Sequence, residues 1–234
     1  MKPTSLATAA AVLLTMVCAQ AICLADPVVN TDFSKGDFKA LGWEPQGAWD
    51  ITTYPVDKND PGAVARYAAN PPADHPDGTL TKTFDEVKDP KKLTVSVDVG
   101  WGWGGENHAQ GTGFMLVDAK GNGYVFMVMR AKGKWAVHYA PVANSTVPKD
   151  KSWAQEDVDT MQPSIRDGGG MQTLVVTRDD QGNWTFSSKN WNKGAGGTVK
   201  FTDKTTTSFT KLVLLGAHNI DDMAFNHIVL VVDK

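Results

Sequence analysis

The segment Leu93-Thr-Val-Ser-Val-Asp-Val99 carries the clearest structural signal in the chain. Apolar residues occupy every second position, and Thr94, Ser96 and Asp98 occupy the positions between them. Successive side chains of a β-strand point to opposite faces of its sheet, so this alternation predicts a strand with one buried face and one polar face. A half-buried strand of this kind is typical of an antiparallel sheet.

Short runs of similar character lie on both sides of this segment, separated by turns rich in Gly, Asn, Asp and Pro. No long window repeats apolar residues at helical spacing. We expect further strands at residues 28–33, 49–52, 64–68, 79–84, 114–117, 124–130, 135–140, 172–178, 184–188, 198–202, 211–216 and 224–232. About a dozen short strands at regular spacing predict one all-β domain, an antiparallel two-sheet β-sandwich.

The predicted hairpin at residues 124–140 has two semi-apolar faces. If the chain turns at Lys132-Gly133, the numbers of opposing residues sum to 265. One face then carries Tyr124, Phe126, Val128, Arg130, Trp135, Val137 and Tyr139, and the other carries Val125, Met127, Met129, Ala136, His138 and Ala140. Neither face is the polar surface of an exposed sheet. We expect one face to pack on the core and the other to line a groove; the alternative is that both faces are packed.

Residues 1–25 have the layout of a secretory signal peptide, which leaves residues 26–234 as the folded domain. Lys2 precedes an apolar run at residues 6–17, and the small-residue sites Ala19-Gln-Ala21 and Cys23-Leu-Ala25 follow it. The run is shorter than the roughly 20 residues that cross a bilayer, so we expect no membrane span. We expect cleavage to remove both cysteines and to deliver a secreted or periplasmic protein; an uncleaved N-terminal anchor is the alternative.

The composition excludes several classes of protein. A net charge of −3 disfavours a basic nucleic-acid binder. Two cysteines in 234 residues cannot form a disulfide scaffold, and 41% hydrophobic residues do not suit a disordered chain. We therefore expect a monomeric domain that is stabilised by its own core.

The order of three segments resembles a known family. These are the hairpin Gly121-Asn-Gly-Tyr124, the segment Leu174-Val-Val-Thr-Arg-Asp-Asp-Gln-Gly-Asn-Trp184, and the strand Phe225-Asn-His-Ile-Val-Leu230. Together they resemble the concanavalin A-like lectin/glucanase jelly rolls, particularly the laminin G-like domains of secreted bacterial proteins, over residues 28–234. The resemblance implies two antiparallel sheets, one of them concave, with ligands bound on the concave side or at the loop rim. Lectins, carbohydrate-binding modules, glycosidases and lyases share this fold, so the fold does not select one function.

The sequence contains no clear pattern of catalytic residues. Glycosidases need two carboxyl groups flanking the scissile bond. The chain has four Glu and no Glu-x-Asp-x-(x)-Glu run; the closest match, residues 156–159, is interpreted as a solvated loop. Lyase chemistry would need a neutralising group and a base, but strand parity separates Arg130 from His138. We assign no catalytic residue, although a hydrolase or lyase on the same fold stays open as an alternative, as does a protein-interaction or structural domain.

Metal chemistry is equally weak in the sequence. The five His residues show no ligand spacing, so we assign no metal ligands and no certain cofactor. Asp57-Lys-Asn-Asp60 and Asp221-Asp222 offer oxygen ligands, which keeps a structural calcium open.

The most unusual segment is Gly100-Trp-Gly-Trp-Gly-Gly-Glu-Asn-His-Ala-Gln-Gly-Thr-Gly113. Flat aromatic faces beside polar side chains suit sugar rings, whose C–H faces stack while their hydroxyls hydrogen-bond. We therefore expect a carbohydrate ligand at a rim and a concave face. The expected rim residues are Trp101, Trp103, Glu106, Asn107 and His108, and the expected concave-face residues are Arg130, Trp135 and Tyr139. In the alternative interpretation, both rim tryptophans cap the core.

Overall fold

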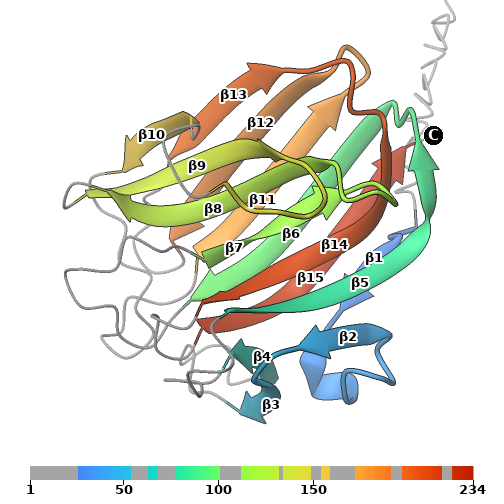
Figure 1. The fold of residues 1–234 in the computed structure, drawn as a ribbon, viewed down its shortest axis with the longest axis vertical. Helices are drawn as coiled ribbons and strands as arrows, with labels where there is room; N and C mark the ends of the chain where they lie inside the picture. Colours follow the sequence, from blue (N-terminus) through green and yellow to red (C-terminus); the bar gives the residue numbers. More distant parts are fainter. Residues whose placement is uncertain are drawn as a thin grey trace, which may run out of the picture.

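The computed structural model describes residues 26–53, 63–67, 77–100, 112–131, 134–148, 154–158, 172–190, 197–217 and 223–233. Within these ranges the chain forms fifteen strands and one short 3₁₀ helix, η1 (Phe33–Lys35). The strands make two antiparallel sheets that lie face to face (Figure 1). The prediction of an all-β, two-sheet sandwich is confirmed.

One sheet has eight strands in the order β13-β12-β11-β6-β15-β4-β3, with β1 paired to β15. The alternating segment Leu93–Val99 lies in β6, at the centre of the sheet between β11 and β15. The bounds are β1 (Val29–Thr31), β3 (Trp49–Thr53), β4 (Ala63–Tyr67), β6 (Lys92–Gly100), β11 (Gln172–Asp179), β12 (Asn183–Asn190), β13 (Thr198–Thr202) and β15 (Met223–Asp233).

The other sheet has seven strands in the order β10-β9-β8-β7-β14-β5-β2. All its pairings are antiparallel. The bounds are β2 (Trp43–Gln46), β5 (Asp77–Lys88), β7 (Thr112–Val117), β8 (Gly123–Ala131), β9 (Lys134–Val142), β10 (Ala154–Val158) and β14 (Ser208–Ala217).

Two strands, β2 and β10, are absent from the sequence prediction, and both lie at the edges of the seven-stranded sheet. The interpretation of residues 156–159 as a solvated loop is wrong for Glu156–Val158, whose backbone pairs with β9. Edge strands tolerate charged residues and proline, because one side of their backbone has no neighbour to satisfy. Charges in β10 and Pro45 in β2 therefore hide the strand pattern.

The main core lies between the two sheets. The alternating residues Leu93, Val95, Val97 and Val99 of β6 are all fully buried there, as their spacing predicts. Trp184, which begins the strand predicted at residues 184–188, is 1% exposed and belongs to the same core. Aromatic rings from both sheets fill the space: Tyr124 and Phe126 of β8 lie 5.3 Å and 6.0 Å from Trp184 of β12.

The β8–β9 hairpin pairs in the predicted register, with Phe126 opposite Tyr139 and Val128 opposite Val137. The other face of the hairpin, which is the outer face of the seven-stranded sheet, does not form an open groove. A second apolar cluster covers this face over β7, β8, β9 and β14, and Val147 packs against the cluster. Its members are at most 9% exposed: Met115, Val117, Val125, Met127, Ala140, Val142, Val213 and Leu215. The prediction of a groove is wrong in this region, and the alternative with both faces packed is correct.

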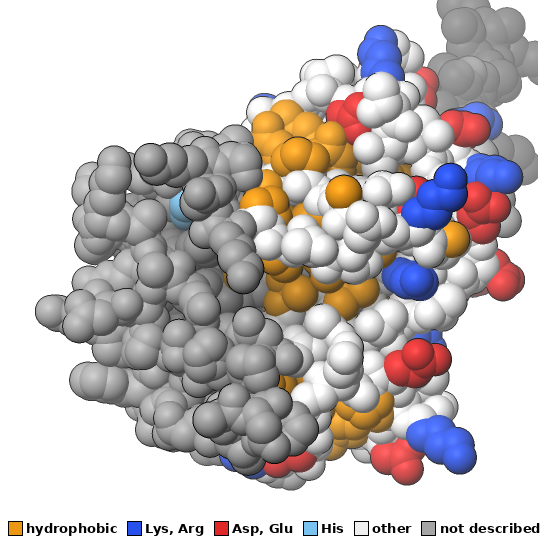
Figure 2. Space-filling view, viewed as in Figure 1, with side chains coloured by type: hydrophobic (Ala, Val, Ile, Leu, Met, Phe, Trp, Pro, Cys, Tyr) orange, Lys and Arg blue, Asp and Glu red, His pale blue; other side chains and the backbone are white. Residues whose placement is uncertain are grey.

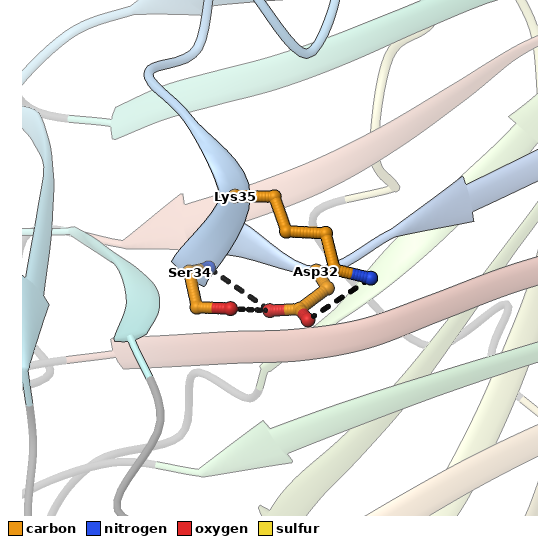
Figure 3. A network of polar contacts seen from close by, with 3 residues as sticks. All are labelled: Asp32, Ser34 and Lys35. Carbon is orange, nitrogen blue, oxygen red and sulfur yellow. Dashed lines mark hydrogen bonds and ion pairs between the residues drawn. The ribbon is translucent and has the colours of Figure 1, made fainter.

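The short helix η1 is fixed by the side chain that precedes it. Oδ1 of Asp32 accepts hydrogen bonds from the Ser34 backbone N–H at 2.9 Å and from the Ser34 hydroxyl at 2.6 Å (Figure 3). The Lys35 ammonium lies 3.5 Å from the same carboxylate. These contacts, led by the bonds from Ser34, lower the pKa of Asp32. Because Asp32 acts as an ordinary helix N-cap, this network is structural.

A search for membrane-spanning helices finds none that is long and apolar enough within the described residues.

Candidate functional site

Five of the predicted ligand contacts, Trp101, Trp103, Glu106, Asn107 and His108, lie outside the described residues. Their attachment points are nevertheless described, because β6 ends at Gly100 and β7 begins at Thr112. The residues that surround these two strand ends therefore define the part of the molecule in which the predicted rim is anchored.

The three predicted concave-face residues occupy the β8–β9 ladder, where Arg130 pairs with Trp135 and Phe126 pairs with Tyr139. Of the three, only Tyr139 has a side chain among those that the structure describes. Its ring stacks on Phe201 of the opposite sheet, with 3.9 Å between centroids and 9° between planes. Burial raises the pKa of its hydroxyl. Tyr139 therefore contributes to the contact between the sheets.

Strand ends from both sheets meet at one end of the sandwich, which we call the polar end (Figure 1). In the eight-stranded sheet, Val99 pairs with Gln172, and Gln172 pairs with Asn190. In the seven-stranded sheet, Gly113 at the start of β7 pairs with Leu215 near the end of β14. Val99, one residue before the end of β6, thus lies beside the first residue of β11.

Buried polar residues gather at this end. Six polar residues there are each at most 5% exposed: Asp98, Thr112, His138, Gln172, Ser188 and Asn226. Burial of a polar group costs free energy unless hydrogen bonds compensate for it. A concentration of such groups at one end of the sandwich therefore needs a structural or functional cause.

The best-defined group is centred on the carboxylate of Asp98. The Thr173 hydroxyl donates a hydrogen bond to its Oδ1 at 2.7 Å. Its Oδ2 lies 2.8 Å from Nδ1 of His227. The Asp98 side chain is 7% exposed, whereas the His227 side chain is 43% exposed. A buried carboxylate thus orients a partly exposed imidazole.

A β-bulge places the imidazole there. The pairing of β15 with β6 shifts register between Asn226 and Val229, and His227 adopts a φ of 44°. A bulge inserts an extra residue and redirects the side chains around it, and such bulges are common beside functional sites. A positive φ at a residue other than glycine is uncommon and signals local strain. The fold therefore accepts a strained backbone to bring His227 to Asp98.

This arrangement has a defined chemical capacity. A ring whose Nδ1 is held by a carboxylate has Nε2 as its second polar atom. An oriented imidazole can donate a hydrogen bond to a ligand hydroxyl or accept one from it. Acid–base catalysis uses the same carboxylate–imidazole pairing when a reacting group lies within reach.

A second polar pair lies inside the sandwich at the same end. The Ser188 hydroxyl donates to Oε1 of Gln172 at 2.9 Å, and Gln172 is fully buried. Nε2 of Gln172 and the Thr112 hydroxyl have no hydrogen-bond partner among the described residues. Gln172 and Ser188 have the same strand parity as the core residues Leu174 and Phe186. The pair is therefore separated from Asp98 by the thickness of the sheet.

The described residues do not fit a calcium ion. They contain no group of three or more His, Cys, Asp or Glu side chains that could hold a metal. Calcium takes about 6–8 oxygen ligands, whereas both oxygens of Asp98 are already engaged by Thr173 and His227. The calcium candidates Asp57, Asp60, Asp221 and Asp222 lie outside the described residues.

The outer face of the seven-stranded sheet is seen in Figure 2. Over its coloured part, hydrophobic and uncharged polar side chains cover the middle, and charged side chains of both signs lie toward the right-hand edge. Three threonines of β5, Thr79, Thr81 and Thr83, alternate with Leu80 and Lys82 and so share one face of their strand. This part of the surface suits an uncharged ligand better than a strongly charged one.

Asp98, Thr173 and His227 are the residues that sequence reasoning missed. The alternation in β6 assigns Asp98 only to a polar face, and the five histidines show no pattern. The contacts join residues that are 75 and 129 positions apart in the chain. The site could have been predicted only if the strands beside β6 in its sheet were known. The strand pattern of the sequence does not specify these neighbours.

No protein-family model and no curated protein matches the chain. Solved structures do match. The carbohydrate recognition domain of Emp47p is 12% identical, with a TM-score of 0.60 over 90% of this chain and 97% of that chain. The exoplasmic/lumenal domain of VIP36, in a form bound to Ca²⁺ and Man3GlcNAc, is 12% identical, with a TM-score of 0.54 over 88% of each chain.

A third match is the CBM2 module of the evolved Dit of Lactobacillus casei BL23 phage J-1. It is 12% identical, with a TM-score of 0.56 over 90% of this chain and 97% of that chain. At such low identity these likenesses concern the fold alone. They show that the chain has the concanavalin A-like jelly-roll fold that the sequence resemblance implies.

Proposed function

We propose that this chain is an exported, monomeric, non-catalytic module that binds carbohydrate at its polar end. The contacts assigned to the ligand are Trp101, Trp103, Glu106, Asn107 and His108, with His227 beside them. The observation that carries the proposal is the Asp98–His227 pair, which lies at the strand end that leads directly into the tryptophan-rich segment.

Two chemical requirements of sugar binding support this choice. Sugar rings stack on flat aromatic side chains, and their hydroxyls need polar groups held in fixed positions. The segment after Gly100 supplies two tryptophans, and Asp98 fixes one imidazole. The similar structures agree with this reading, since the matched VIP36 domain is bound to Man3GlcNAc.

The proposal revises the set of concave-face residues. It omits Tyr139, because that ring packs on Phe201 between the sheets. Arg130 and Trp135 stay as candidates by position, since their pairing is among the last in the β8–β9 ladder before the hairpin tip.

Export follows from the signal-peptide pattern of residues 1–25. Both cysteines, Cys18 and Cys23, belong to that segment. The domain that remains after cleavage would have no thiol and would depend on its apolar core. The proposal assigns no metal ligand, and the calcium candidates Asp57, Asp60, Asp221 and Asp222 lie outside the described residues.

The Asp98–His227 pair also favours a second candidate, a polysaccharide hydrolase or lyase in which His227 acts as acid or base. His138, which the sequence analysis considers for lyase chemistry, is less suitable because it is 3% exposed. Tyr124, another residue type that can act as a base, donates its hydroxyl hydrogen bond to Asp203. A third candidate is a domain that binds another protein.

One panel of soluble polysaccharides and arrayed glycans separates the three. We expect saturable binding to at least one glycan, with no release of reducing ends or unsaturated sugars during long incubation. Release of products by the unmodified protein but not by His227→Ala would show that the chain is a polysaccharide hydrolase or lyase instead. The absence of both binding and turnover would leave the protein-binding domain.

A further inference from the structure

Three turns meet at the end of the sandwich opposite the polar end (Figure 1). They join β5 to β6, β11 to β12, and β13 to β14. Together they line an open pocket of about 260 Å³. Its walls include residues from segments 89–91, 178–182 and 204–207.

Hydrogen bonds hold the three turns against one another. The Asp203 N–H donates to the Gly182 carbonyl at 2.8 Å, and the Asp89 N–H donates to the Thr207 carbonyl at 2.8 Å. Gly182 has a φ of 74°, and a Cβ there would lie 2.5 Å from the Asp203 carbonyl oxygen. The pocket is therefore built into the fold before any ligand arrives.

Arg178 is the unusual member of the lining, because it is 5% exposed. Its Nη1 donates to the carbonyl oxygens of Pro90 at 3.1 Å and Asp179 at 3.3 Å. The guanidinium carbon lies 5.9 Å from the centroid of the Trp184 ring. These contacts hold the guanidinium group in one position.

Among the described residues, the other edge of this guanidinium has no hydrogen-bond partner. Both hydrogen bonds come from Nη1, and Nε is buried without a hydrogen-bond partner. Within the described part of the chain, no ion pair includes Arg178; its charge nevertheless adds to the hydrogen bonds from Asn183 that lower the pKa of the Asp179 carboxyl. Buried charges in proteins are normally paired, and a buried donor without an acceptor is costly. A guanidinium group is also a common protein partner of carboxylate and phosphate groups.

The lining adds two further cations. Lys91 and Lys204 are exposed and contribute to the pocket, and neither belongs to an ion pair of the described residues. The carboxylates of Asp89 and Asp180 also line it, so cations outnumber anions by three to two. Because the most buried of these charges is a cation, the innermost position favours a negative group.

We propose that this pocket binds a small oxyanion, a carboxylate, sulfate or phosphate group, beside the guanidinium group of Arg178, with the ammonium groups of Lys91 and Lys204 around it. The site is separate from the proposed carbohydrate site, because it lies at the other end of the sandwich. The oxyanion could arrive as a free ion or as the acidic group of a sugar, and the experiment distinguishes these sources.

The test is an NMR titration of the exported protein that follows the Nε–Hε signal of Arg178 and the amide signals of Gly182 and Thr207. Sodium sulfate, galacturonate and an oligogalacturonate are added at constant ionic strength set with chloride. We expect saturable shifts at these three signals. Equal affinity for the monomer and the oligomer assigns the site to free anions, whereas tighter binding of the oligomer assigns it to an acidic sugar.

The exposed lysines provide variants that should fold normally. Lys91→Ala and Lys204→Ala should each weaken binding about tenfold, as expected for a lost hydrogen bond between charged groups. Lys39→Ala and Lys189→Ala are matched controls, because both are exposed and neither lines the pocket. Three results would overturn the proposal: no saturable shift, shifts that persist unchanged in the Lys91→Ala/Lys204→Ala protein, or shifts that only Ca²⁺ produces. None of them bears on the tryptophan-rich site.

Discussion

The Tyr124 hydroxyl donates a hydrogen bond to Oδ2 of Asp203 at 2.9 Å. This bond joins β8 of the seven-stranded sheet to the turn after β13 of the eight-stranded sheet. Asp203 also accepts bonds from the N–H groups of Thr205 and Thr206 and from the Thr205 hydroxyl. One carboxylate thus fixes its own turn and connects the two sheets.

Tyr124→Phe should lower the free energy of unfolding by about 1.5 kcal/mol, because it removes one bond to a charged acceptor and leaves the ring in place. The measurement is urea unfolding at neutral pH. Tyr139→Phe is the matched control: its ring stacks on Phe201, and no described hydrogen bond uses its hydroxyl. Equal losses in the two variants would contradict the importance of the Tyr124–Asp203 bond.

Stability should also fall in acid through Asp203. Burial alone would raise the pKa of this carboxyl, but hydrogen bonds from Thr205, Thr206 and Tyr124 outweigh burial and lower it well below its ordinary value. A depressed folded-state pKa contributes stability above the unfolded-state pKa of about 4, and that contribution is lost as the pH falls toward the folded-state pKa.

Asp203→Asn should therefore be less stable than the unmodified protein at pH 7, and the difference should shrink below about pH 4. Urea unfolding of both proteins between pH 2 and pH 7 provides the comparison. A difference that stays constant through this range would show that the charge of Asp203 has no role.

Gly113→Ala should destabilise the protein by about 3 kcal/mol or prevent folding, because it overpacks a buried site. A Cβ at this position would lie 2.0 Å from the Phe126 carbonyl oxygen. Gly36→Ala is the control, since its Cβ would meet nothing nearer than 3.4 Å. Soluble yield and thermal unfolding distinguish the two variants. A stable Gly113→Ala protein would contradict the described close pairing of β7 with β8.

Asp98→Ala should lower stability by about 2 kcal/mol, because Thr173 and His227 both lose their acceptor. It should also weaken glycan binding under conditions in which the protein stays folded. Asp85→Ala changes an exposed carboxylate of β5 and should do neither. Loss of stability with unchanged glycan affinity would show that the Asp98–His227 pair is only structural.

Much of the fold could be predicted from local patterns. The alternation in residues 93–99 identifies β6, and the two-residue turn at Lys132-Gly133 is consistent with the observed register of β8 and β9. The edge strands β2 and β10 could not be predicted, because proline and charge are tolerated at an edge and remove the apolar alternation.

The site was harder to predict for the same kind of reason. The sequence analysis identifies a tryptophan-rich segment, but the Asp98–His227 contact depends on which strand lies beside β6 and on a bulge in β15. Neither follows from periodicity. The hairpin faces show a further limit, because apolar residues on both sides of β8 and β9 are equally consistent with a groove and with a second packed cluster.

The most direct test of the central claim is calorimetric titration of the exported protein and of its Trp101→Ala/Trp103→Ala variant with the strongest glycan from the panel. We predict saturable binding by the unmodified protein and at least a tenfold loss in the variant, since stacking on an aromatic ring contributes about 1–3 kcal/mol by analogy with base stacking. The Trp101→Phe/Trp103→Phe protein retains flat rings and should retain most of the affinity. Unchanged affinity in a folded Trp101→Ala/Trp103→Ala protein would contradict the account.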